Sequence, residues 1–156
     1  MISYKDFIKE SKGGFVSLQL SNYSKAQIKE ITDDIGMTDI IDDMHITIIY
    51  DKSNPDLSPP PVKEEYLAKV SGVARMGDVG SEWEAITLHL HSPDMATLHE
   101  RLIETGYKHS YDEFVPHLSI KYKPSKADVD LIEQNATRFR AMDLTFNNFN
   151  IEMIKE

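Results

Sequence analysis

Two short stretches of this 156-residue chain contain the same pattern of residues that could carry out acid–base chemistry. "HITIIY" begins at His45 and "HLSIKY" begins at His117, and each has a hydroxyl residue, Thr47 or Ser119, two positions after the histidine. Imidazoles titrate near neutral pH, so one can take a proton from an attacking oxygen while another gives a proton to a departing oxygen. Hydroxyls beside them can stabilise negative charge that grows in a transition state. The two stretches therefore predict two halves of one catalytic site.

Both stretches alternate polar and apolar residues, which predicts β-strands. Alternate side chains of a strand point to opposite faces, so the histidine and the hydroxyl residue of each motif share a face. By the same parity, Lys121 is expected beside His117 and Ser119. The first motif has Ile49 at the matching position, so the two halves are not expected to act identically.

The elements around the motifs occur in the same order twice. The first unit is a strand at 14–20, a helix that ends at Gly36 and the strand 45–50; the second is a strand at 83–91, a helix that ends at Gly106 and the strand 117–122. Ser24 with Gln27 predicts a capping box for the first helix. Ser92 and Pro93 predict the start of the second helix. This weak internal repeat implies two similar lobes.

Four further features complete the expected chain. They are a proline-rich linker or surface flap at 51–63, a hairpin of 66–76 with 83–91, a short helix capped by Ser125 with Asp128, and one or two closing strands within 142–154. At this length the chain can bury a real core, and we predict one domain over residues 1–156.

The charge and composition exclude several classes of function. With 26 acidic and 17 basic residues the formal charge is −9, which argues against a protein that coats long DNA or RNA. A small anionic ligand needs only a local positive pocket, and lysines at 108, 121, 123 and 126 could provide one, although a scattered solubilising role is simpler for each lysine taken singly. The absence of cysteine excludes thiolate chemistry. Without a long apolar run, we expect a soluble protein that is not exported.

The remaining histidines are compatible with more than one role. A half-solvated antiparallel sheet also alternates polar and apolar residues, although histidines are uncommon on such a face. His89 and His91 have a metal-ligand spacing, and a motif histidine could add a third ligand, but no other residue has a spacing that completes the set. Support of the catalytic residues, or plain exposure, is the simpler role for this pair. His99 and His109 are expected on the surface.

The paired His-x-Thr/Ser motifs resemble those of the two-histidine (2H) phosphoesterase superfamily. The resemblance implies an α+β, bilobal and pseudo-symmetric fold, with largely antiparallel sheets, helices on the outer faces and a central groove. It implies that His45, Thr47, His117 and Ser119 are the catalytic residues. The chain length, "YKDFI" at 4–8 and "HITIIY" are most similar to the phage anti-CBASS proteins, which degrade the cyclic oligonucleotide messengers of bacterial antiviral signalling.

This resemblance implies a small cyclic di- or trinucleotide as substrate and the cytoplasm of an infected bacterium as location, with no membrane, long nucleic acid or obligate protein partner. A ribose 2′-hydroxyl would attack the adjacent phosphorus, so that no metal or other cofactor is required. Stacked bases would need aromatic platforms, for which Phe15, Trp83, Tyr111 and Phe114 are candidates, although each could equally be an ordinary core or edge aromatic. Lys121, expected on the face of His117 and Ser119, completes the substrate contacts as a predicted contact to the phosphate.

Two other functions fit the same residues. A 2H enzyme that acts on RNA ends or on linear 2′,5′-oligoadenylates would use the same four catalytic side chains. A module that only sequesters a nucleotide would keep the groove and its aromatics, but it would not need both histidines.

Overall fold

The structure is a computed structural model that describes residues 13–111 and 113–155. The segment "YKDFI" lies outside the described residues. The strands are β1 (Phe15–Leu20), β2 (His45–Tyr50), β3 (Tyr66–Met76), β4 (Ala85–His91), β5 (His117–Tyr122) and β6 (Asp143–Glu152). The helices are α2 (Asn22–Ile35), α3 (Pro93–Thr105), α4 (Lys126–Gln134) and α5 (Ala136–Phe139).

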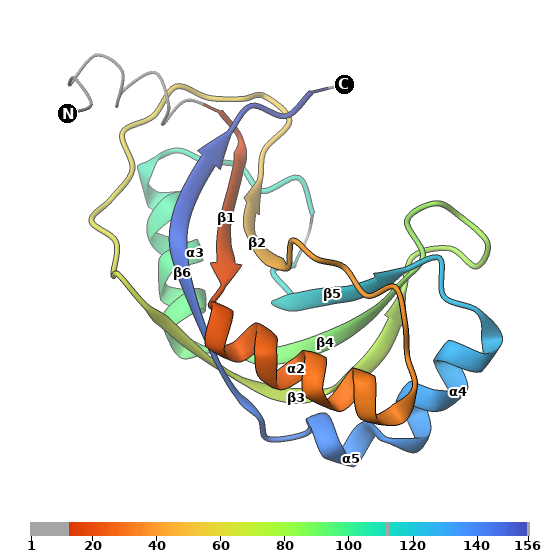
Figure 1. The fold of residues 1–156 in the computed structure, drawn as a ribbon. Coiled ribbons are helices and arrows are strands. Elements are labelled where there is room, and N and C mark those ends of the chain that lie inside the picture. Colours follow the sequence, from red (N-terminus) through yellow and green to blue (C-terminus); the bar gives the residue numbers. More distant parts are fainter. Residues whose placement is uncertain (1–12, 112, 156) are drawn as a thin grey trace.

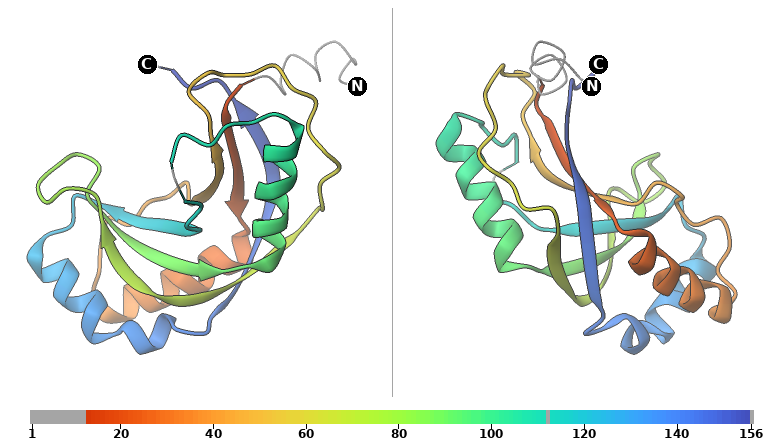
Figure 2. Two further views of the ribbon diagram at one scale, coloured as in Figure 1. Left: turned by 180° about the vertical axis from the view of Figure 1, so that it is seen from behind. Right: turned by 60° about the vertical axis from the view of Figure 1, so that its left-hand side comes forward.

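The six strands form one continuous sheet in the order β2-β1-β6-β3-β4-β5, and every neighbouring pair is antiparallel. The predicted α+β class with largely antiparallel pairing is therefore confirmed, with a single sheet in place of several. Figure 1 shows that this sheet bends sharply, so that β1, β2 and β6 form one arm and β3, β4 and β5 form the other. The helices lie on the outer side of the bend (Figure 2).

The two strands that begin with the motif histidines, β2 and β5, are the opposite edges of the sheet. The bend nevertheless brings these edges into contact. The loop between α2 and β2 crosses from one edge to the other, since the Ile41 N–H donates to the Ile120 carbonyl over 2.8 Å. The two halves of the sheet have the same order when each is counted inward from its edge: β2, β1 and β6 in one half, and β5, β4 and β3 in the other. In each half the edge strand begins with the motif histidine, the second strand precedes the helix that leads to that edge strand, and the third is a long central strand. The bend of the sheet thus places the two motifs at one location.

The core follows the predicted alternation along the strands. Val16, Leu18, Leu88 and Leu118 are fully buried on the face that the helices cover. Burying each such side chain contributes roughly 1.5–3 kcal/mol, so these apolar faces fix the orientation of the strands. The opposite, more polar face is the one that lines the inside of the bend.

The first helix begins earlier than its predicted capping box. Ser21 is the N-cap of α2, and its hydroxyl accepts a hydrogen bond from the Ser24 N–H. Ser24 is fully buried and its hydroxyl accepts from the Thr145 N–H over 2.9 Å, which ties α2 to β6. The prediction of a cap at Ser24 with Gln27 was therefore wrong, because tertiary contact with β6 uses the Ser24 hydroxyl.

The other predicted helix starts are confirmed. Ser92 caps α3 with Pro93 in the first turn, and Ser125 with Asp128 forms a reciprocal capping box at α4. The hairpin of β3 with β4 is also confirmed, and one closing strand, β6, is found within residues 142–154.

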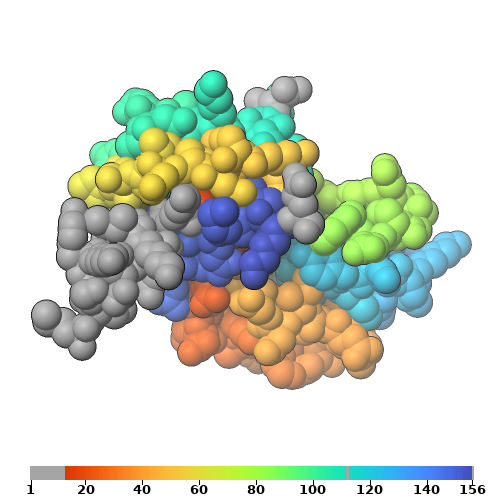
Figure 3. Space-filling model, turned by 90° about the horizontal axis from the view of Figure 1, so that it is seen from above, coloured from red at the N-terminus to blue at the C-terminus, as the bar shows by residue number. Residues whose placement is uncertain are grey.

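The proline-rich segment 51–63 lies alongside α3 (Figure 3). Leu57 packs against Gly106 at the end of α3, where a Cβ would stand 3.3 Å from its side chain, and Lys63 pairs with Asp94 over 3.1 Å. The segment is thus held on the outer surface and away from the inside of the bend. Within residues 13–111 and 113–155, none of the helices has the length and apolar character needed to cross a membrane.

Candidate active site

A hollow of about 110 Å³ lies where the two edges of the sheet approach each other. It is lined by Ile41, Asp43, His45, Thr47, His117, Ser119 and Tyr122. Both predicted motif pairs therefore line the same hollow, although they are far apart in sequence and on opposite edges of the sheet. Ile41 and Asp43 come from the loop that joins α2 to β2.

The two imidazoles are held in the same way. Nδ1 of His45 lies 3.3 Å from the carbonyl of Asp43, and Nδ1 of His117 lies 2.8 Å from the carbonyl of Val115, in each case two residues earlier. A carbonyl oxygen can only accept, so each Nδ1 carries the proton and donates it. In the neutral side chain Nε2 then has the free lone pair. Both histidines thus keep Nε2 available for proton transfer.

Each histidine has a different neighbour on the adjacent strand. Gln19 is opposite His45, and His89 is opposite His117. Burial, and then the charge of His117, lower the pKa of His89. Its Nε2 is buried and finds no hydrogen-bond partner among the described residues. His89 is therefore a neutral neighbour of His117 on the inside of the bend.

The arrangement gives no support to the alternative of a metal bound through His89 and His91. In the part of the chain that the structure describes, no three histidine, aspartate or glutamate side chains are grouped so that they could hold a metal ion. The His91 side chain is exposed at the end of β4.

A β-bulge changes which residues of β5 face the hollow. Ser119 is opposite Thr87, but Lys121 is opposite Ile86, so Ile120 is an extra residue that β4 does not match. Directly opposed residues of an antiparallel pair point to the same face, and Ile86 is buried in the core. Lys121 therefore points away from the face of Ser119. The parity argument failed here because a bulge inserts one residue and reverses the alternation beyond it.

Lys121 does not line the hollow, so the prediction that it lies beside His117 and Ser119 was wrong. Its ammonium group lies 2.9 Å from the carboxylate of Asp128 and 2.8 Å from the carbonyl of Thr38. Burial acts to raise the pKa of Asp128, but hydrogen bonds from Ser125 and Lys121 and the charge of Lys121 outweigh it, and the pKa is lowered. Lys121 thus ties β5 to α4 and to the loop between α2 and β2.

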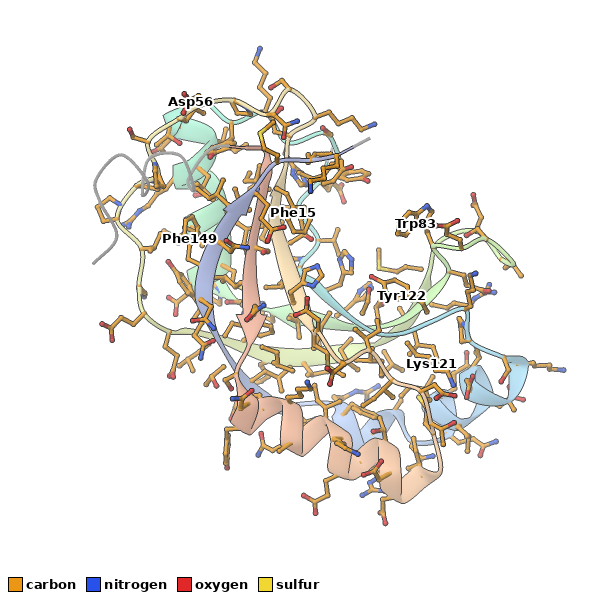
Figure 4. The ribbon with its side chains drawn as sticks, turned by 45° about the horizontal axis from the view of Figure 1, so that its top comes forward. Phe15, Asp56, Trp83, Lys121, Tyr122 and Phe149 are labelled. Carbon is orange, nitrogen blue, oxygen red and sulfur yellow. The ribbon has the colours of Figure 1, made fainter. Side chains whose placement is uncertain are left out.

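Because of the bulge, Tyr122 lines the hollow, whereas parity alone predicts that it points to the core face of the sheet. Figure 4 shows Tyr122 and Lys121 leaving β5 in different directions. An equivalent bulge occurs in β2, where Ser17 is opposite Thr47 but Val16 is opposite Ile49. The sequence hinted at this role of Tyr122 only in that both motifs end in Ile-x-Tyr.

Comparison with known proteins identifies the family of the chain. A sequence model described as "Anti-CBASS protein Acb1" matches residues 12–155 of the chain. The chain belongs to this family. Both predicted motifs lie within the matched residues.

Two relatives share this description. Anti-CBASS protein Acb1 of Vibrio phage KVP40 is 25% identical over 115 residues, which cover 72% of this chain and 74% of that protein. A protein of the same description from Sphingomonas paeninsulae is 28% identical over 98 residues, which cover 59% of this chain and 16% of that longer protein. The similarity to the phage protein therefore extends over most of both chains.

None of the four aromatics predicted for substrate contacts in this Acb1-family chain is among the residues that line the hollow. Phe15 has its ring centroid 5.8 Å from that of His45, in an edge-on arrangement. Tyr111 is 63% exposed and contacts Tyr50, which in turn contacts Phe15. Trp83 is 72% exposed on the loop between β3 and β4 (Figure 4). Of the four predicted aromatics, only Phe15 touches a motif histidine.

Phe114, the fourth predicted aromatic, stacks on His99 with ring centroids 4.4 Å apart. His99 and His109 are half-buried, so the expectation that both lie on the surface was wrong. Nδ1 of His99 donates to the Ile48 carbonyl over 2.8 Å, and Nδ1 of His109 accepts from the Tyr50 N–H over 3.1 Å. The two imidazoles thus provide hydrogen-bond partners for the Ile48 carbonyl and the Tyr50 N–H on the outer edge of β2. Such backbone groups have no strand partner on an edge strand.

The charges around the hollow differ from the predicted lysine cluster. The described residues that line it include one carboxylate, Asp43, and no lysine or arginine. Lys121 is paired elsewhere, as described above. Positive charge at this site would therefore come from a protonated imidazole.

Proposed function

We propose that this protein is a metal-independent phosphodiesterase that hydrolyses cyclic di- or trinucleotide messengers and so counteracts CBASS antiviral signalling. The observation that carries the proposal is that His45, Thr47, His117 and Ser119, from opposite edges of the sheet, line one small hollow. Membership of the Anti-CBASS protein Acb1 family supports the biological role. The matching order of strands from each edge supports the bilobal interpretation of the 2H resemblance.

The proposed reaction uses the two imidazoles in complementary protonation states. A neutral Nε2 takes the proton from a ribose 2′-hydroxyl, and the 2′-oxygen attacks the adjacent phosphorus. The bond from phosphorus to the 5′-oxygen of the next nucleotide breaks, and the protonated imidazole gives its Nε2 proton to that oxygen. The product is a linear oligonucleotide with a 2′,3′-cyclic phosphate, which water can open with the acid and base roles exchanged.

The two hydroxyls would act on the phosphate itself. Thr47 and Ser119 lie two residues after each histidine on the same face, so they are placed to donate hydrogen bonds to the non-bridging oxygens. Because no lysine or arginine is among the described lining residues, these donors and the imidazolium would carry the stabilisation of the transition state.

The substrate is expected to be a small molecule in the cytoplasm of an infected bacterium. A net charge of −9 opposes binding along a long nucleic acid, whereas one phosphate fits a hollow of about 110 Å³. The bases would then lie outside the hollow, along Phe15 on one side and Trp83 on the other.

The decisive experiment incubates the purified protein with cyclic di- and trinucleotides in EDTA and resolves the products by chromatography. We expect cleavage in EDTA, and we expect His45→Ala and His117→Ala each to lower kcat/KM by about 10²- to 10⁴-fold. His91→Ala, an exposed histidine outside the hollow, is the matched control and should retain activity.

Other outcomes would change the assignment. Activity that EDTA abolishes and zinc or manganese restores would overturn the metal-independent mechanism. Binding of the cyclic nucleotide without cleavage would indicate a sequestering module, and cleavage of only linear 2′,5′-oligoadenylates or RNA ends would indicate a different substrate.

The same assay tests the two hydroxyl residues. Thr47→Val and Ser119→Ala should each reduce kcat by about 10²- to 10³-fold.

A further inference from the structure

We infer that Tyr122 is a further substrate-contacting residue, whose phenol donates a hydrogen bond to a non-bridging oxygen of the phosphate in the hollow. The inference rests on the proposed phosphodiester substrate. It assigns to Tyr122 the phosphate contact that strand parity alone assigns to Lys121.

The position of Tyr122 follows from the bulge in β5. Because Ile120 is unmatched, Tyr122 is opposite Ala85, and Ser119 is opposite Thr87. These positions share the inside face of the sheet, and Tyr122 lines the hollow with both motif histidines. Ala85 is small, so the neighbouring strand leaves space for a tyrosine ring at this point.

The bulge is held in place by a contact from outside the sheet. The carbonyl of Ile120 accepts from the Ile41 N–H over 2.8 Å, and Ile41 itself lines the hollow. Lys121 is fixed on the other face by Asp128 and the Thr38 carbonyl. These contacts of Ile120 and Lys121 fix the backbone just before Tyr122, and therefore the face to which the Tyr122 side chain points.

The chemistry of the hollow favours a neutral donor at this position. A phosphate would meet the Asp43 carboxylate there and no described lysine or arginine, so it depends on N–H and O–H donors. A phenol can donate one hydrogen bond and carries no charge at neutral pH. Tyr122 is 45% exposed, so its ring is accessible from the solvent side of the hollow.

The corresponding tyrosine of the first motif makes a useful comparison. Tyr50 also follows a bulge and is opposite Phe15, but it packs against Phe15 and Tyr111 and does not line the hollow. The two motifs thus end in the same residue, and only the second copy reaches the phosphate.

The test compares Tyr122→Phe, Tyr122→Ala and the matched control Tyr50→Phe in the cleavage assay. We expect Tyr122→Phe to lower kcat by about 10²-fold, nearly as much as Tyr122→Ala, with an unchanged Tm because the side chain is 45% exposed. Tyr50→Phe should keep the activity of the unsubstituted protein. Full activity of Tyr122→Phe would overturn the inference, and a loss confined to Tyr122→Ala would show that the ring stacks on a base and does not donate to phosphate.

A binding measurement separates this inference from the proposed function. If the unsubstituted protein cleaves no phosphodiester, the proposed function fails, and titration calorimetry with a cyclic dinucleotide then tests Tyr122 alone. Weaker binding by Tyr122→Phe than by Tyr50→Phe would support the phosphate contact, and equal binding would overturn it.

Discussion

Replacing Lys121 with methionine tests the conclusion that this side chain holds the fold together and does not contact substrate. Methionine keeps most of the length and apolar area of lysine but removes the ammonium group. The variant would leave the Asp128 carboxylate without its cation and the Thr38 carbonyl without its donor. The expected result is a clear loss of stability.

The magnitude follows from the burial of the pair. The side chains of Lys121 and Asp128 are only 12% and 13% exposed, which places them between a buried and a surface ion pair. Removing one partner of a buried pair costs about 3–5 kcal/mol, whereas an exposed pair contributes about 0–1 kcal/mol. Since Asp128 keeps its bond from the Ser125 N–H, we expect a loss of about 2–3 kcal/mol, or about 5–10 °C in Tm.

The matched control is Lys69→Met. Lys69 pairs with Asp143 over 3.2 Å, but the two side chains are 56% and 77% exposed. Its loss should cost less than about 1 kcal/mol. Thermal and urea unfolding of both variants provide the measurement. An equal effect of the two substitutions would refute the argument, as would a larger loss of kcat/KM in folded Lys121→Met than in Tyr122→Phe.

Three further results are expected. Gly14→Ala should lower stability by about 1–3 kcal/mol or more, because a Cβ would overlap the Asp51 carbonyl, whereas Gly72→Ala meets nothing within 4 Å and should change little; chemical denaturation compares them. Burial, then the charge of His99, lower the pKa of His109 below 6.5, so the unfolded chain takes up a proton first as pH falls. The free energy of unfolding should therefore decrease from about pH 6.5 downward, and His109→Gln should reduce this decrease in urea titrations. Finally, kcat/KM should depend on pH as a bell-shaped curve, since one imidazole must be neutral and the other protonated; a flat profile would contradict the mechanism.

The sequence by itself determined the local features of this protein. The alternation in "HITIIY" and "HLSIKY" was enough to predict two strands that each place a histidine and a hydroxyl on one face. Ser92 and Ser125 correctly predicted helix starts, because a cap depends on residues only two or three positions away. These are short-range effects, and a single sequence contains all the information they need.

The tertiary structure decided where those features meet. Which strands form the edges, and that a bend brings the edges together, depends on pairing between strands distant in sequence. The bulges depend on the neighbouring strand, and on outside contacts such as the Ile41 N–H and the His99 ring, so parity counted along one strand misplaced Lys121 and missed Tyr122. Alternation is a property of one strand, whereas register is a property of two, and for that reason the final residues of the site became visible only in the fold.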